Sequence, residues 1–285
     1  MLNLALALST ALLLVLSFPR FDFVWLAPLA LAPLLFALAR EPRPWRRFLL
    51  GWIAGVAYWL GTCYWIQIVL ARHGRLSASL AWLAVVLFAL IKGLHLAVFA
   101  LLAGIAIRRS WAVLAVPALW VAFERTHGPL GFAWLALGNA GIDMGLPMRL
   151  APYTGVYGLS FVFAMCGTAL ALAALRRPRR HLAFLLPLAV LYLLPRLPEA
   201  QRGTETAVLV QPNISQDADW TEPWVRRMLD RLAWLSFGAS TAARPATPAF
   251  IIWPEVPLPA YYYENTQFRD LVSDVARSTD SHLCL

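Results

Sequence analysis

The stretch RLPEAQRGTETAVLVQPNISQDADW, Arg196 to Trp220, divides the chain into two parts of different composition. Before it, long apolar runs alternate with short links rich in arginine. Within it polar residues return, and the run Ala207–Val210 ends in the turn residues Gln-Pro-Asn. A β-branched run followed by turn residues predicts a strand. The sequence therefore predicts a transmembrane helical domain over residues 1–200 and the beginning of an α/β domain over residues 201–285.

The composition of the chain indicates a polytopic membrane protein. Of the 285 residues, 60% are hydrophobic and 14% are charged, whereas soluble domains carry about 45–50% apolar and about 25% charged residues. The net charge of +9 does not indicate a nucleic-acid partner, because the arginines cluster in links between apolar runs, where they act as topology signals. The three cysteines and five histidines show no metal-ligand spacing. We therefore expect no metal.

Seven apolar segments precede the change in composition, and each is a candidate membrane span. A span needs roughly 20 residues, so the first two segments are at the short end and the fifth is below it. We expect about seven transmembrane helices. The segments cover approximately residues 2–18, 23–39, 49–71, 78–107, 111–124, 157–175 and 181–195.

The arginines between these segments predict the orientation of the chain. The even-numbered links hold ten of them and the odd-numbered links hold five. Because positive residues are enriched on the cytoplasmic side, the N-terminus and the even-numbered links are expected in the cytoplasm. After seven crossings, the residues beyond about 195 lie on the far side. In the inner membrane of a bacterium that side is the periplasm.

The last 80 or so residues alternate between strand and helix patterns. After the strand at 207–210, residues 221–238 and 265–280 carry helical spacing, residues 250–253 form a second apolar run, and residues 281–285 begin a third. This order predicts a layered α/β domain. Two or three strands with helices on one side leave the other sheet face bare, so we expect this domain to be incomplete over residues 201–285.

The block FIIWPE, Phe250 to Glu255, places one carboxylate at the end of the second strand. Pro254 has no backbone N–H and cannot donate to a sheet ladder, so pairing is expected to stop there. Ligands of open α/β sheets bind outside the carboxyl ends of the strands. Flanked by Trp253 and Val256, Glu255 is expected to be partly desolvated, which suits a general base. A solvated charge that merely ends a strand is the alternative.

A few further residues are candidates for a functional role. Trp220 ends the polar loop after the first strand and can line a ligand groove or lie at the lipid interface. Glu124 and Arg125 end the fifth apolar segment. Ionisable residues at membrane depth are functional candidates; the alternative is that the two pair with each other in an orienting role. Lys92 and His95 lie one turn apart within the fourth segment. A polar cavity is one environment for them, but we expect that they snorkel or are satisfied by neighbouring helices.

Six blocks, in this order along the chain, resemble the bacterial apolipoprotein N-acyltransferase family, an inner-membrane enzyme with a periplasmic nitrilase-like domain. The WPE block alone indicates only the wider nitrilase superfamily, but six blocks spread over the whole chain make the match specific. They are LSFPRFDFVWLAPLALAPLLFAL, GVAYWLGTCYWI, ALWVAFERTHGPLGFAWLALG, LAPYTGVYGLSF, VLVQPNISQDADW and FIIWPE.

The resemblance implies a fold and a reaction. The α/β part would be the start of a nitrilase-like αββα sandwich. The enzyme would transfer an acyl chain from a phospholipid to the N-terminal α-amino group of a diacylglyceryl-cysteine apolipoprotein, through a thioester on a cysteine. The family uses a Glu-Lys-Cys triad, and the resemblance implies no separate cofactor. Its glutamate matches Glu255, which would be the general base, and a tryptophan important in the family matches Trp220.

Two members of that triad have no match in this sequence. The single lysine of the chain, Lys92, lies in the fourth apolar segment. Cys284 is only 29 residues beyond Glu255 and is followed by Leu285, whereas the family's nucleophile lies far downstream, before an aromatic and an acidic residue. The later strands and the family's last membrane helix have no match either. We therefore expect an N-terminal fragment that is inactive by itself.

Two other functions remain open. A transporter or lipid-binding protein with a periplasmic cap would use Lys92, His95 and Glu124 as a polar path, although transporters often show internal repeats and none is visible among the seven segments. A membrane-tethered carbon–nitrogen hydrolase would share Glu255 but act on small amides. The membrane blocks FERTHGPLGFAWL and APYTGVYGLSF favour the acyltransferase.

Overall fold

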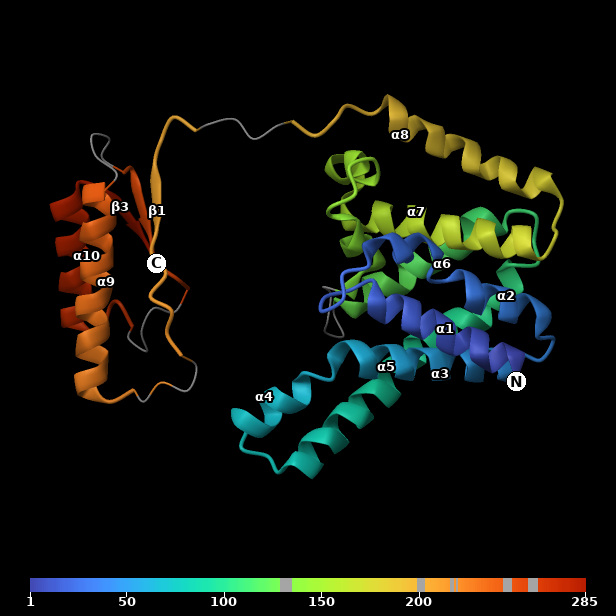
Figure 1. Ribbon diagram of the computed structural model, residues 1–285, viewed down its shortest axis with the longest axis horizontal. Helices are drawn as coiled ribbons and strands as arrows, with labels where there is room; N and C mark the ends of the chain where they lie inside the picture. Colours follow the sequence, from blue (N-terminus) through green and yellow to red (C-terminus); the bar gives the residue numbers. More distant parts are fainter. Residues whose placement is uncertain (129–134, 199–202, 216–217, 219, 243–247, 256–260) are drawn as a thin grey trace. The chain divides into compact units, whose positions relative to one another are not determined.

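The computed structural model divides the chain into two compact units, Met1–Pro198 and Glu199–Leu285. The structure describes residues 1–128, 135–198, 203–215, 218, 220–242, 248–255 and 261–285. The first unit is helical and the second combines helices with a small sheet (Figure 1). Each unit has a hydrophobic core of its own.

Unit 1 is a bundle of α-helices joined by short 3-10 turns. Its elements are α1 Leu2–Leu16, η1 Val24–Leu29, α2 Ala32–Arg40, α3 Pro44–Cys63, α4 Ile66–Arg72, α5 Ala78–Ala106, α6 Ala112–His127, η3 Leu137–Gly141, η4 Pro147–Leu150, α7 Ala151–Ala174, η5 Arg179–Ala189 and α8 Val190–Leu193. Several begin where the sequence favours a helix start: a single proline occupies one of the first two positions of α2, α3, η4 and α7, where a missing N–H costs nothing.

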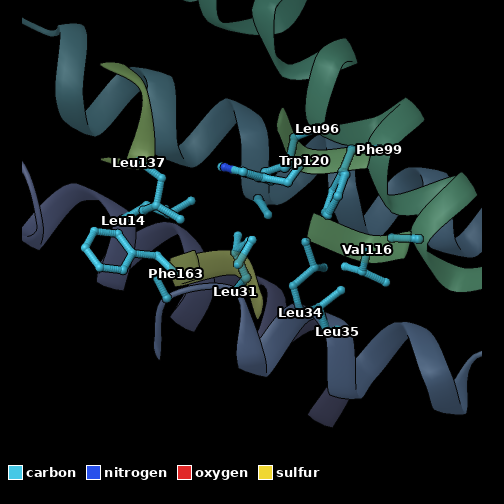
Figure 2. Packing of buried hydrophobic residues seen from close by; sticks show 14 of the residues in the cluster. Leu14, Leu31, Leu34, Leu35, Leu96, Phe99, Val116, Trp120, Leu137 and Phe163 are labelled. Carbon is cyan, nitrogen blue, oxygen red and sulfur yellow. The ribbon is translucent and has the colours of Figure 1, made fainter. Parts of the chain in front are cut away.

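The core of unit 1 forms where five helices converge. Leu14 of α1, Leu34 of α2, Phe99 of α5, Trp120 of α6 and Phe163 of α7 belong to one cluster of buried residues (Figure 2). All five side chains are buried. Because lipid tails are as apolar as these side chains, close packing rather than the hydrophobic effect holds such a bundle together in a membrane.

Helices α3 and α5 approach each other through glycines. A Cβ atom added to Gly55 would lie 2.8 Å from the Cα and carbonyl oxygen of Gly93, and one added to Gly51 would lie 2.5 Å from the carbonyl oxygen of Leu96. Gly51 and Gly55 are four residues apart, which places both on the face of α3 that meets α5. This pairing of small residues is typical of membrane helices in close contact.

Two stretches of the described chain are long and apolar enough to cross a membrane, α5 and the helical stretch Pro147–Ala174. Helices α3 and α4, bent by 52° at their junction, make a third if they form one span. The first two predicted spans correspond to the shorter apolar helices Leu2–Leu16 and Val24–Arg40. The last, residues 181–195, is formed by η5 and the four-residue α8. The arrangement with seven transmembrane helices stays a prediction.

Unit 2 contains a three-stranded parallel sheet in the order β1-β2-β3. Its elements are β1 Ala207–Leu209, α9 Glu222–Ala242, β2 Phe250–Ile252, α10 Thr266–Thr279 and β3 His282–Cys284. This order of strands and helices confirms the alternation expected from the sequence. Parallel neighbours require crossover connections, which α9 and α10 supply.

One face of this sheet packs against helices and the other is exposed. Val208, Ile251 and Leu283 are in register and belong to the core with α9 and α10, which lie side by side (Figure 1). Side chains alternate along a strand, so Leu209 points to the opposite face, where it is 75% exposed. The bare sheet face expected from the sequence is therefore present in the part of the chain that the structure describes.

Candidate functional site

Glu255 follows the central strand of the sheet at its carboxyl end. The backbone N–H of Trp253 still donates to the carbonyl oxygen of Cys284, at 3.0 Å. Pro254 comes next, so the pairing stops where the sequence predicted, and Glu255 emerges beyond it. The edge at the carboxyl ends of parallel strands is where open α/β sheets bind ligands.

The environment of Glu255 differs from the expected one. Glu255 is exposed rather than partly desolvated, so the prediction of a desolvated carboxylate is wrong; Val256 lies outside the described residues. The reason is the direction of Trp253, whose side chain is 3% exposed and packs into the core of unit 2. Its Nε1 donates to Ser236 Oγ of α9 at 3.0 Å. This tryptophan anchors the strand end and leaves the carboxylate accessible to a reactant.

Trp220 lies between β1 and α9, two residues before α9 begins at Glu222. Its side chain is 43% exposed and meets Trp224 edge to face, with ring centroids 4.6 Å apart. Because β1 and β2 are parallel neighbours, the segments that follow them leave from one edge. Glu255 emerges at this edge, and within the described ranges no hydrogen bond joins it to the side chain of Trp220. Their roles as substrate-binding residue and base stay predictions.

Cys284 belongs to the sheet itself. It is a free cysteine, exposed, and in register with Ile252 of the central strand. The adjacent Leu283 packs toward the helices, so Cys284 points to the uncovered face. It therefore projects from a strand rather than from the loops at the carboxyl edge. The expectation that it is not the nucleophile stays a prediction.

A second group of polar residues is buried within unit 1. Lys92 of α5 is 4% exposed, and its Nζ lies 3.2 Å from Nδ1 of His127 on α6. The ammonium also lies 5.0 Å from the ring centroid of Trp59, and the ring of His95 lies 4.6 Å from that of His127. The prediction that Lys92 is satisfied by neighbouring helices is confirmed. Cation–π contacts are strongest when they are desolvated, so we expect the buried contact of Lys92 with Trp59 to be a strong one.

Glu124 is buried beside this group but holds other partners. Its Oε1 accepts hydrogen bonds from Trp120 Nε1, at 2.6 Å, and from the backbone N–H of Leu137, at 2.7 Å. Its Oε2 has no hydrogen-bond partner among the described residues. At the next residue of η3, the N–H of Gly138 donates to Ser160 Oγ of α7 at 2.8 Å. Glu124 and Ser160 thus fix η3 between α6 and α7.

Glu124 and Arg125 do not pair with each other. Arg125 instead lies over the ring of Tyr157, 5.1 Å from its centroid. Consecutive residues of a helix point in different directions, which explains why Glu124 enters the bundle while Arg125 leaves it. Sequence reasoning also missed His127 and Ser160. The position of His127, one turn after Glu124 in the same helix, was the available signal.

The larger pockets of unit 1 lie near the helix ends. One of about 520 Å³ is formed where α1 ends, α3 ends and η3 begins, with Cys63, Asn139, Asp22 and Asp143 in its wall. Another, of about 460 Å³, lies among the start of α1, the end of α2 and the start of α3. No group of three or more His, Cys, Asp or Glu side chains able to hold a metal occurs among the residues described.

Unit 1 has helices that are long and apolar enough to cross a membrane. Unit 2 is an α/β unit with a carboxylate after its central strand. This combination is typical of a membrane protein with an attached α/β domain. The family model for the apolipoprotein N-acyltransferase N-terminal domain matches residues 10–169. The chain belongs to the apolipoprotein N-acyltransferase family, whose named members are acyltransferase enzymes.

Individual relatives extend the match into unit 2. The apolipoprotein N-acyltransferase of Geobacter metallireducens is 30% identical over 290 residues, which cover 95% of this chain and 54% of the relative. The enzyme of that name from Coxiella burnetii is 27% identical over 99% of the chain and 59% of the relative. That of Azotobacter vinelandii is 33% identical over 91% and 52%. The chain spans about half the length of the curated relatives it matches.

Proposed function

We propose that this chain forms the membrane unit and the first strands of the catalytic domain of a phospholipid-dependent N-acyltransferase. The enzyme moves an acyl chain to the N-terminal α-amino group of a diacylglyceryl-cysteine apolipoprotein. The observation that carries the proposal is the position of Glu255, exposed at the carboxyl end of the central strand β2. Family membership supplies the reaction class, and the names of the relatives supply the acceptor.

In the proposed reaction, Glu255 acts as general base. It accepts the proton of a cysteine thiol, and the thiolate attacks the carbonyl carbon of the phospholipid ester. The ester C–O bond breaks, the lysophospholipid leaves with a proton, and a thioester remains on the enzyme. The amine of the lipoprotein then attacks the thioester and releases the thiol. A lysine would stabilise the oxyanion in both steps.

The position of Glu255 at the carboxyl end of β2 supports this role. An accessible carboxylate at a sheet edge can reach a thiol and exchange its proton with solvent between the two half-reactions.

The substitution Glu255→Gln, placed in the enzyme that carries the complete triad, keeps the shape of the side chain but removes the base. We expect at least a hundredfold loss of kcat, because general bases contribute about 10²–10⁴-fold. The matched control is Glu264→Gln, on a separate exposed turn of the same unit. Normal activity in Glu255→Gln would overturn the assigned role.

The 285-residue chain is proposed to lack turnover by itself. Lys92, its single lysine, is buried in α5 of unit 1 against His127, and Cys284 projects from β3. The test is an N-acylation assay with a purified diacylglyceryl lipopeptide and phospholipid vesicles. Formation of the N-acyl product by this chain would contradict the proposal of inactivity.

We further propose that the chain is placed in a bacterial inner membrane with its N-terminus in the cytoplasm and residues after about 195 in the periplasm. The arginine-rich links support this orientation, since positive residues are retained on the cytoplasmic side. Alkaline phosphatase fused after residue 198 should be active, because this reporter works only outside the cytoplasm, and a fusion after Arg109 should be inactive. The reverse pattern would invert the proposed topology.

A transport or lipid-binding role without chemistry is the second candidate. One observation favours it: Lys92, His127 and His95 form a contiguous polar group inside the bundle. The bonds of Glu124 to Trp120 and to the backbone of Leu137 weigh against a continuous path that uses this carboxylate. Measurement of solute uptake with Lys92→Gln would separate the two functions.

A further inference from the structure

A groove of about 460 Å³ lies at the arginine-rich end of unit 1. It belongs to a different unit from Glu255, which is part of unit 2. Arg40 from the end of α2 and Arg46 from the first turn of α3 line it, together with Trp45. Its apolar wall continues down α3 through Leu49 and Ile53. Figure 1 shows the N-terminus of α1 and the link between α2 and α3 at the same end of the unit.

The two guanidinium groups of this groove are stacked but not neutralised. Arg40 lies 5.4 Å from the ring centroid of Phe36, and Arg46 lies 5.2 Å from that of Trp45. Within residues 1–128 and 135–198, neither forms an ion pair with a carboxylate. Arg46 also lies in the first turn of α3, where the positive end of the helix dipole disfavours a cation. A bound anion would offset both unfavourable features.

The single acid in the wall of the groove does not supply that anion. The carboxylate of Glu41 is mostly buried and accepts the backbone N–H of Arg43 at 3.2 Å. The carbonyl oxygen of Glu41 accepts hydrogen bonds from Arg47, at 2.7 Å, and from Arg108, at 3.0 Å. These contacts tie the residue that follows α2 to α3 and to the link after α5, and they leave Arg40 and Arg46 available for a ligand.

We propose that this groove binds an anionic glycerophospholipid, with its phosphate between Arg40 and Arg46 and an acyl chain along Leu49 and Ile53. Planar guanidinium groups bind phosphate oxygens well, and basic pockets between membrane helices on the cytoplasmic side suit anionic head groups. The apolar wall below the arginines favours a lipid over a free anion. This lipid would be a structural ligand of the inner leaflet, separate from the acyl donor of the proposed reaction.

The test uses native mass spectrometry of the full purified chain in detergent, with phosphatidylglycerol or phosphatidylcholine added. We expect phosphatidylglycerol to bind at least tenfold more tightly, and the double substitution Arg40→Gln, Arg46→Gln to abolish this preference. The matched control, Arg72→Gln with Arg75→Gln, removes two exposed arginines from another link and should keep it. Because all four side chains are exposed, the thermal midpoints of the variants should match that of the parent.

Three results would overturn the proposal. The first is equal binding of both lipids by the parent chain. The second is a loss of the preference in the control pair that is as complete as in the groove pair. The third is displacement of phosphatidylglycerol by inorganic phosphate at millimolar concentration, which would make the groove a site for a free anion. None of these results bears on Glu255, whose activity assay is separate.

Discussion

Lys92 Nζ and His127 Nδ1 lie 3.2 Å apart across the interface of α5 and α6, inside the bundle. The two residues are 35 positions apart in the sequence. Trp59 from α3 completes the contact, since its ring faces the ammonium and lies edge-on to His127. One buried lysine thus connects three helices through polar and aromatic contacts.

The first prediction concerns this pair. His127→Ala should lower the free energy of unfolding by about 1–3 kcal/mol, because the buried ammonium loses a hydrogen-bond partner. Lys92→Met should cost less, since the charge is removed together with its need for partners. Denaturation of the single and double variants in detergent measures their coupling, with His73→Ala, at an exposed position, as control. Additivity within about 0.5 kcal/mol would show that the pair is not energetically coupled.

The second prediction concerns the glycine contact of α3 with α5. Gly55→Ala should destabilise the bundle by about 1–3 kcal/mol, because its Cβ would overlap backbone atoms of Gly93 and force the helices apart. Gly145→Ala is the matched control, since a Cβ there meets no atom within 4 Å. Thermal unfolding in detergent compares them. Equal midpoints for the two variants would argue against a tight α3–α5 interface.

The third prediction concerns Glu124. Glu124→Leu should cost about 2–4 kcal/mol of stability, because it leaves the Trp120 and Leu137 N–H groups buried without their acceptor. Glu124→Gln keeps an acceptor oxygen and should lose less than half of that. Asp143→Leu, at an exposed position, is the control for the change from acid to leucine. Limited proteolysis after η3 should accelerate in Glu124→Leu alone; unchanged cleavage would show that Glu124 does not fix this turn.

The fourth prediction concerns unit 2. Trp253→Phe should lower the stability of this unit by about 1 kcal/mol or more, since it removes the hydrogen bond to Ser236 and part of the buried ring. Trp234→Phe, on the same unit but 71% exposed, should change stability little. Amide hydrogen exchange of β2 in the full chain reports the local effect. Faster exchange in Trp234→Phe than in Trp253→Phe would contradict the assigned anchor.

Local patterns predicted much of unit 2. The apolar run before Pro254, the turn residues after Ala207–Val210 and the spacing of apolar residues in 265–280 each act over a few neighbouring positions. These patterns predicted the observed β1, β2 and α10. Helix α10 is capped by Asn265 Oδ1, which accepts the N–H of Phe268 at 2.9 Å.

The errors in the predictions concerned the directions of side chains. Glu124 does not pair with Arg125, because consecutive residues of a helix point in different directions. Glu255 is not desolvated by Trp253, because the tryptophan packs into the core against α9 and the strand pairing ends before Glu255.

The sequence by itself therefore determined the membrane character of the first unit, the alternation of strands and helices in the second, and the position of Glu255 after a strand. These features depend on hydropathy and on short-range backbone preferences, which a chain carries locally. Only the tertiary structure decided that Lys92 meets His127, that Glu124 binds the backbone of η3, and that Arg40 and Arg46 line one groove. Each of these contacts joins segments that helix packing brings together, and no local pattern specifies which helix faces meet.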